Sequence, residues 1–186
     1  LGREEELCTG DMLMVVRNKY FSDSRAVAGT GGGSLAFIAN GDRAEVRRVR
    51  NIRSLYGFRF ADVALRFPDY DGQELDFTLL LDTLASEAPA LTREQGERLY
   101  NAVMDDYADI PLKADRLKRL RHDDYYNALQ VKFAYAVTCH KAQGGQWAHV
   151  YIDQGYMTDE MLSADYIHWL YTAFTRATEK LFLVKV

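Results

Sequence analysis

The sequence predicts an α/β protein that combines a parallel β-sheet with a small inserted β-barrel. Short apolar runs separated by Asn-Gly and Asp-Gly turn signals fill residues 10–84, a pattern typical of a small antiparallel barrel or meander. Compact apolar runs alternate with segments of helical character over residues 131–186, which indicates a parallel sheet covered on both faces. Between these zones, residues 91–129 have the periodicity of helices.

The composition bounds the protein class. Of the 186 residues, 48% are hydrophobic and 12% aromatic, which excludes a disordered chain. No stretch approaches ~18 consecutive apolar residues, so we expect no membrane span. The two cysteines, Cys8 and Cys139, give neither a disulfide framework nor a metal-binding pattern, which favours a reducing cytoplasmic location. Because the chain begins at Leu1 and not at Met, we expect it to be a piece of a longer protein.

The formal net charge of −4 conceals three charged blocks. Residues 42–59 hold six arginines against two acids, and residues 62–87 hold seven acids against one arginine. Residues 113–121 hold five basic side chains against Asp115. Such blocks contact phosphates in some proteins and only keep the surface soluble in others. For residues 113–121 both alternatives stay open.

In the first zone, the apolar run at residues 12–16 predicts a strand that joins the parallel sheet. A glycine-rich run at residues 29–34 predicts a loop, because it has no lysine and no helical pattern after it. The further strands of this zone are expected at residues 35–39, 44–49, 58–67 and 75–81. On this interpretation residues 18–84 form the inserted barrel, and residues 1–17 and 85–186 form the α/β domain.

The middle zone predicts two helices. Thr92 and Gln95 have the spacing of a capping box, which marks the start of the first helix. One face of this helix carries Leu99, Val103 and Tyr107 at intervals of four residues. Pro111 interrupts the pattern, and a basic helix is expected over residues 114–121.

The third zone predicts strands near residues 133–137, 149–152 and 181–184. Between the last two strands lies a helix with one apolar stripe, formed by Ile167, Leu170, Tyr171 and Phe174. Polar groups gather where the first of these strands ends. In open parallel sheets, ligands bind at that end of the strands.

The polar segment at residues 136–147 reads A-V-T-C-H-K-A-Q-G-G-Q-W. The side chains of Thr138, His140 and Lys141 suit phosphate or sugar contacts. Gly144 and Gly145 would let the backbone approach a ligand closely. An ordinary strand-to-helix turn with a capping threonine is the alternative.

A second segment, residues 170–181, reads L-Y-T-A-F-T-R-A-T-E-K-L. Near the end of its helix lies Arg176, whose guanidinium is always charged and carries a fork of donors suited to phosphate. A surface arginine paired with Glu179 is the alternative.

In this order, the two segments resemble motifs V and VI of superfamily 1 DNA helicases of the RecD-like/Dda-like branch, which carry a UvrD-like helicase C-terminal domain. The fifth motif of that family reads approximately T-x-H-K-S/A-Q-G-x-E/Q, and the sixth reads approximately Y-T/V-A-L/F-S/T-R-A. Residues 10–20, G-D-M-L-M-V-V-R-N-K-Y, are also similar to the family's G-D-x-(apolar)-R-N-x-Y strand.

The resemblance implies the second RecA-like domain of such a helicase, of P-loop NTPase type, with an SH3-like barrel inserted at residues 18–84. It implies an ATP-dependent motor that moves 5′→3′ on single-stranded DNA, and a role in DNA repair or recombination such as that of exodeoxyribonuclease V. The implied partners are single-stranded DNA, the N-terminal RecA-like domain of the same parent chain and helicase–nuclease subunits. No membrane partner is implied.

The resemblance also implies roles for individual residues. Arg176 would be the catalytic arginine finger and, with Gly144 and Gln146, would line the ATP site. The implied DNA-binding residues are Thr138, His140, Lys141 and Gln143, with Asn18 as a weaker candidate. The full-length protein would use ATP and Mg²⁺. Because the sequence contains no G-x-x-x-x-G-K-S/T, we expect this chain to bind neither alone and to hydrolyse no ATP.

Two alternatives remain open. The chain could be a binding module without motor activity, in which the arginine block at residues 43–59 of the barrel recruits DNA or a protein. It could also be a degenerate helicase relative, because the family most often carries glutamate where Gln146 stands.

Overall fold

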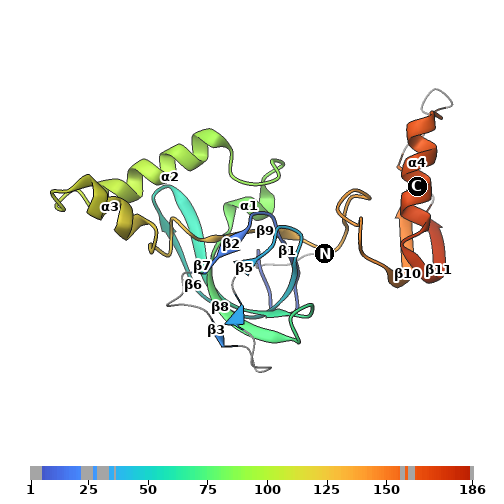
Figure 1. Ribbon diagram of the computed structural model, residues 1–186, viewed down its shortest axis with the longest axis horizontal. Coiled ribbons are helices and arrows are strands. Elements are labelled where there is room, and N and C mark those ends of the chain that lie inside the picture. The colour runs from blue at the N-terminus through green and yellow to red at the C-terminus, as the bar shows by residue number, and fades with distance from the viewer. Residues whose placement is uncertain are drawn as a thin grey trace. The chain divides into compact units, whose positions relative to one another are not determined.

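The computed structural model describes residues 6–21, 27–28, 34–35, 37–155, 158 and 162–184. The chain divides into two compact units, Leu1–Tyr135 and Ala136–Val186 (Figure 1). Of the glycine-rich run predicted to be a loop, residues 29–33 lie outside the described residues.

The first unit contains a closed five-stranded β-barrel with the strand order β1-β6-β7-β8-β9. Its strands are β1 (Met12–Val15), β6 (Arg43–Leu55), β7 (Phe58–Phe67), β8 (Gln73–Leu80) and β9 (Leu129–Phe133). Neighbouring strands pair antiparallel except β8 and β9, which pair parallel. Because β9 also pairs with β1, it closes the barrel.

The barrel encloses the larger of two apolar cores. Fully buried side chains from several strands fill it, among them Leu13, Val15, Val63, Leu65 and Val131. Each such side chain contributes about 1.5–3 kcal/mol by leaving water. Two short ribbons accompany the barrel: β2 (Lys19–Tyr20) pairs with β5 (Phe37–Ile38), and β3 (Val27–Ala28) pairs with β4 (Ser34–Leu35).

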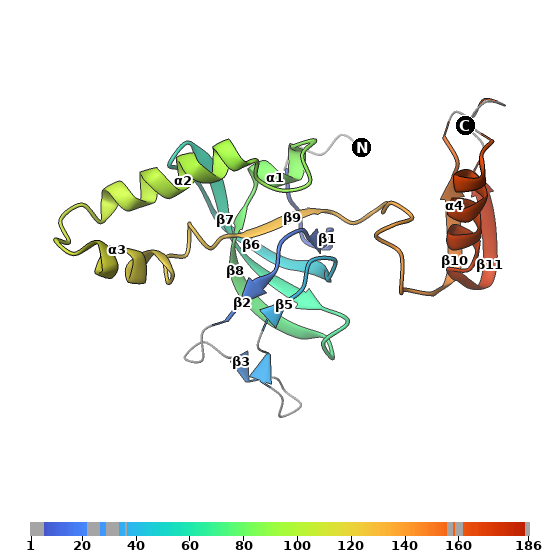
Figure 2. The ribbon, with the colours of Figure 1, turned by 45° about the horizontal axis from the view of Figure 1, so that its top comes forward.

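The helices of the first unit lie between β8 and β9 in sequence. They are α1 (Asp82–Ala85), α2 (Arg93–Asp106) and α3 (Lys113–Leu120). The predicted capping box is confirmed, since the Thr92 side chain accepts from the Gln95 N–H while the Gln95 side chain accepts from the Thr92 N–H. Leu99 and Val103 on α2 are buried, as their spacing predicts. They pack with Phe60 and neighbours in the second apolar core, which joins α2 and α3 to the β6–β7 hairpin. Figure 2 shows the course of α2 past the end of this hairpin.

The second unit contains two parallel strands and one helix. The strands β10 (Trp147–Asp153) and β11 (Ala177–Val184) pair in parallel, and α4 (Ala164–Phe174) connects them. Ser163 caps α4 by accepting from the Tyr166 N–H. None of the helices among the described residues has the length and apolar composition needed to cross a bilayer.

The predicted fold class, a RecA-like (P-loop NTPase-type) parallel-sheet domain with an inserted SH3-like barrel, is wrong. The molecule is mostly β, with a closed barrel and few helices. The run at residues 12–16, expected in the parallel sheet, forms β1 and pairs with β6 and β9 of the barrel. The apolar run expected as a strand at residues 133–137 contributes only Phe133, the last residue of β9. In the described part of the second unit, parallel pairing is therefore limited to β10 and β11.

Candidate functional site

The segment before β10 forms a compact turn in the second unit. Its backbone folds back on itself, because the Ala142 N–H lies 3.1 Å from the carbonyl oxygens of both Thr138 and Cys139. Ala142 is buried, and the Cys139 thiol lies 3.6 Å from the Trp169 carbonyl oxygen of α4. The turn is thus anchored by its small residues, while its polar side chains face outward.

The two glycines of this turn have different structural needs. Gly144 has a φ of +86°, in the left-handed region that favours glycine. At Gly145 a β-carbon would lie 2.4 Å from the Trp147 ring, so a side chain there would displace the indole. These constraints explain the Gly-Gly pair without a ligand, so the role of Gly144 in ATP binding stays a prediction.

Arg176 ties the end of α4 to this turn. Its Nη1 donates to the Gly145 carbonyl at 3.0 Å, and its Nε donates to the Thr172 carbonyl at 3.0 Å. Its Nη2 donates to the Thr175 hydroxyl at 3.1 Å. The backbone adds a further link, because the Trp147 N–H donates to the Arg176 carbonyl at 2.8 Å. The two motifs, some thirty residues apart in sequence, therefore meet at the guanidinium.

The remaining predicted site residues occupy two places. Exposed on the turn lie Thr138, His140, Lys141, Gln143, Gly144 and Gln146. The Gln146 amide donates to the Thr175 carbonyl at 3.4 Å, which a glutamate could not do. Asn18 belongs to the first unit, where its Oδ1 accepts from the Asn40 N–H at 2.8 Å and so holds the turn before β6. Among the described residues, no group of three or more His, Cys, Asp or Glu is placed to hold a metal ion.

Comparison with known proteins fits this geometry. Residues 133–184 match the UvrD-like helicase C-terminal domain family. The match includes both motifs and every described helix and strand of the second unit, and it supports a helicase-related role. No curated protein matches the chain. The UvrD-like segment thus coincides almost entirely with the unit in which Arg176 joins the turn to α4.

Outside the UvrD-like segment, the structure neutralises most of the arginine block at residues 43–59. Five of its six arginines form ion pairs: Arg43–Asp69, Arg47–Glu45, Arg48–Asp76, Arg53–Asp62 and Arg59–Glu6. Three of these acids come from the acidic block at residues 62–87, because β7 and β8 bring that block beside β6. The two blocks of opposite charge therefore largely cancel, which weakens the case for a barrel that recruits DNA through these arginines.

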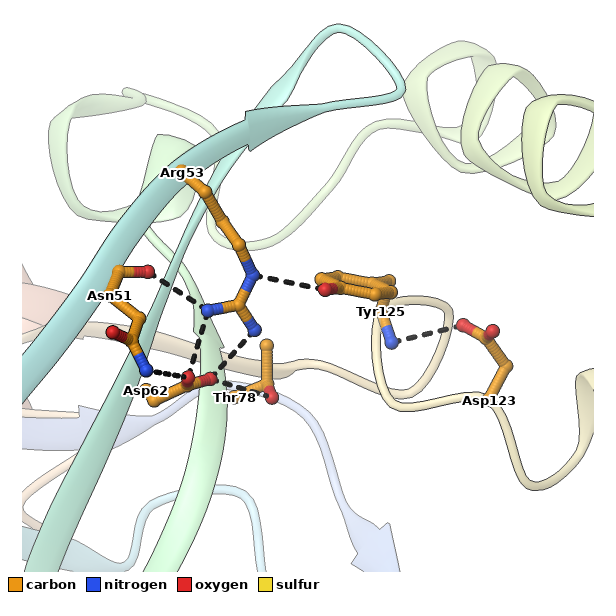
Figure 3. Close-up of polar contacts among 6 residues, drawn as sticks. All are labelled: Asn51, Arg53, Asp62, Thr78, Asp123 and Tyr125. Atoms are coloured by element: carbon orange, nitrogen blue, oxygen red, sulfur yellow. Dashed lines mark hydrogen bonds and ion pairs between the residues drawn. The ribbon is translucent and has the colours of Figure 1, made fainter.

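The best-connected of these arginines is Arg53 (Figure 3). Its Nη1 and Nη2 donate to the two Asp62 carboxylate oxygens at 2.8 and 2.7 Å, and its Nε donates to the Tyr125 hydroxyl at 3.0 Å. Asn51 and Thr78 also donate to Asp62. The hydrogen bonds from Arg53 are the largest cause that lowers the pKa of Asp62 below its ordinary value, and the same pairing raises the pKa of Arg53. The network fastens the loop after α3 to the barrel.

We expect Asp62→Asn to reduce the free energy of unfolding by about 1 kcal/mol at neutral pH, because the pair is bidentate but partly exposed. A carboxyl group with a lowered pKa in the folded state stabilises above its unfolded pKa of about 3.9. This contribution is lost as the pH falls through the folded pKa. Urea unfolding at several pH values should therefore show a difference between wild type and variant that vanishes in acid.

The matched control is Asp76→Asn, which removes one end of a more exposed, single-contact pair with Arg48. It should change the free energy of unfolding by no more than about 0.5 kcal/mol. An Asp62→Asn effect as small as that of Asp76→Asn, or one that persists in acid, would contradict the assignment.

Sequence reasoning missed a cleft in the first unit. It has a volume of about 1150 Å³ and lies among β2, β8 and the loop between α3 and β9. Arg17, Tyr20 and Arg121 are among its lining residues. The only sequence signal was the basic block at residues 113–121, because residues 17–20 and 121–130 come together through the barrel and are distant in sequence.

Proposed function

We propose that this chain is the C-terminal motor part of an ATP-dependent DNA helicase of the RecD-like/Dda-like branch, which moves 5′→3′ along single-stranded DNA. The observation that carries the proposal is the meeting of the two motifs at Arg176 inside the UvrD-like segment. The phosphate-binding loop, absent from this sequence, would come from the N-terminal domain of the same parent protein.

The chemistry proposed for Arg176 is stabilisation of the charge that develops as the γ-phosphate bond breaks. A guanidinium has five N–H donors, and three are used here on Thr172, Gly145 and Thr175. One N–H on Nη1 and one on Nη2 remain for a phosphate oxygen pair. Gly144 and Gln146, exposed beside it, would line the same ATP site.

Single-stranded DNA would contact the outward side of the turn. Thr138, His140, Lys141 and Gln143 are all exposed there, and hydroxyl, imidazole, ammonium and amide groups are common donors to phosphate oxygens. The turn is also hydrogen-bonded to Arg176. A movement of these four residues on DNA binding would therefore be transmitted to the proposed ATP site through the Gly145 carbonyl.

The Mg²⁺ that accompanies ATP would be held by the ATP phosphates and by carboxylates of the N-terminal domain. Helicase–nuclease subunits are the proposed protein partners, and the cytoplasm is the proposed location. A binding module without motor activity is the second candidate, although the ion pairs of the arginine block leave it little free charge.

An unwinding assay on the full-length protein tests the proposal. With ATP, the protein should separate a partial duplex that carries a 5′ single-stranded tail, and it should leave one with a 3′ tail paired. The 186-residue chain alone should unwind neither and should hydrolyse no ATP above background. Unwinding from the 3′ tail only, or the absence of ATP-dependent unwinding on both substrates, would refute the proposal.

A further inference from the structure

The cleft of the first unit carries an exposed aromatic platform at its edge. The Tyr20 ring is 70% exposed and Phe37 is 44% exposed. Their ring centroids lie 5.8 Å apart with an interplanar angle of 27°, so the two rings stack across β2 and β5. Exposed flat π-faces of this kind stack well on nucleobases.

Basic side chains line the cleft beside the platform. Arg17 and Arg121 line the cleft, and both are exposed. Neither guanidinium forms an ion pair or hydrogen bond within the described part of the chain, in contrast to four of the five arginines of β6. Lys19 also lines the cleft and donates to the Asn127 carbonyl. The cleft therefore presents two guanidinium groups that are available for an anion.

The carboxylates of the cleft oppose this charge only in part. Asp76 is neutralised by Arg48 at 3.2 Å. Asp123 accepts hydrogen bonds from the Tyr125 and Tyr126 N–H groups and from the Tyr107 hydroxyl, which raises the pKa of Tyr107 to about 12. Asp123 therefore already accepts several hydrogen bonds that hold the loop after α3. The third acid of the cleft, Asp124, also belongs to its lining.

Helix α3 extends the basic surface away from the cleft. Lys113, Lys118 and Arg119 are exposed and form no ion pair within the described residues. With Arg121 at its end, this helix is the largest group of unpaired cations that the described first unit retains once the β6 arginines are neutralised. A phosphate backbone that enters the cleft at Arg121 would continue along it.

We propose that this cleft binds single-stranded nucleic acid, with bases stacked on Tyr20 and Phe37 and phosphates on Arg17 and Arg121. Stacking on an exposed ring requires unpaired bases, because duplex bases already stack on one another. An acidic protein would use the cations but gain little from the platform. The site lies in the first unit, outside the UvrD-like segment, and does not rest on the function proposed above.

Fluorescence anisotropy with a labelled oligothymidylate of about 12 nucleotides tests the proposal on the whole chain. Tyr20→Ala should weaken binding about fivefold or more, whereas Tyr20→Phe should keep it within about twofold. The matched control is Tyr151→Ala, which removes a ring of similar exposure that stacks on Phe182 in the second unit. The double variant Arg17→Ala/Arg121→Ala should lower the salt dependence of log K by about 1.4, or 0.7 for each lost phosphate contact.

The same titrations are repeated in a His140→Ala/Lys141→Ala background, which removes the DNA contact proposed for the second unit. Binding by the cleft is then measured separately from binding by the second unit. Three results would overturn the proposal. These are an unchanged affinity for Tyr20→Ala in both backgrounds, equal affinity for a blunt duplex of the same length, and competition by polyglutamate as effective as that by unlabelled oligothymidylate.

Discussion

Arg176→Ala in the full-length protein should lower DNA-stimulated ATP turnover by about three orders of magnitude or more. An arginine finger stabilises negative charge that is larger in the transition state than in bound ATP, and its loss typically costs about 10³–10⁵ in rate. Arg176→Lys should lose nearly as much, because a lysine cannot hold Thr172, Gly145 and Thr175 and still present two donors to phosphate. Steady-state ATP hydrolysis with saturating single-stranded DNA is the measurement.

A purely structural role for Arg176 predicts a different pattern. If the guanidinium only held the turn against α4, Arg176→Ala would loosen Thr138–Gln146 and weaken single-stranded DNA binding along with turnover. The finger role predicts that turnover falls by far more than the affinity for DNA without nucleotide, because Arg176→Ala removes the hydrogen bond to the Gly145 carbonyl in either case. Lys180→Ala, which removes an exposed cation of β11 in the same unit, is the control and should leave turnover unchanged. Normal turnover in Arg176→Ala would rule the finger role out.

The local elements of this molecule were predictable because their signals are local. The capping box at Thr92 and Gln95 and the buried pair Leu99 and Val103 need only a few residues of sequence to be recognised. The Asn40-Gly41 turn is of the same kind, since Gly41 has the positive φ, +103°, that such turns require. Each of these features depends only on residues that lie close together in the sequence.

Which strands pair with one another could not be predicted from such local signals. Leu13 in β1 and Val131 in β9 are fully buried, and their apolar runs correctly indicated buried strands. An apolar run reports that a strand is covered, but it does not report which strands pair with it. Leu13 pairs with Ala44 of β6 and with Phe133 of β9, and the second of these partners is more than a hundred positions away in the sequence. The α/β fold class was predicted incorrectly because the apolar runs do not identify the partner strands.

The same distinction between local and long-range features applies to the candidate site. The two motifs were found from sequence because each is a continuous string of chemically distinctive residues. Their junction at the Gly145 carbonyl, and the stacked pair of Tyr20 and Phe37, depend on segments brought together by folding. Charge was misleading for this reason too, since the acidic partners Asp62 and Asp76 of the β6 arginines lie on other strands.

The largest expected effect on stability is that of Phe60→Ala, which should reduce the free energy of unfolding of the first unit by about 3–5 kcal/mol. Phe60 is fully buried in the core that joins α2 and α3 to the barrel, with its ring 5.1 Å from that of Tyr125 in an edge arrangement. Its removal leaves a cavity beneath the loop that also carries Arg121, so single-stranded nucleic-acid binding by the cleft should weaken as well.

Tryptophan fluorescence reports on the second unit, because both tryptophans, Trp147 and Trp169, lie there. In a urea titration, Phe60→Ala should shift the far-ultraviolet circular dichroism transition of the first unit and leave the tryptophan fluorescence transition where it is in wild type. Phe182→Ala, at a side chain 38% exposed in β11, should cost less than about 2 kcal/mol and shift only the fluorescence. A loss below about 1 kcal/mol for Phe60→Ala would contradict its place in the core. A joint shift of both signals would mean that the barrel and the UvrD-like segment unfold as one cooperative body.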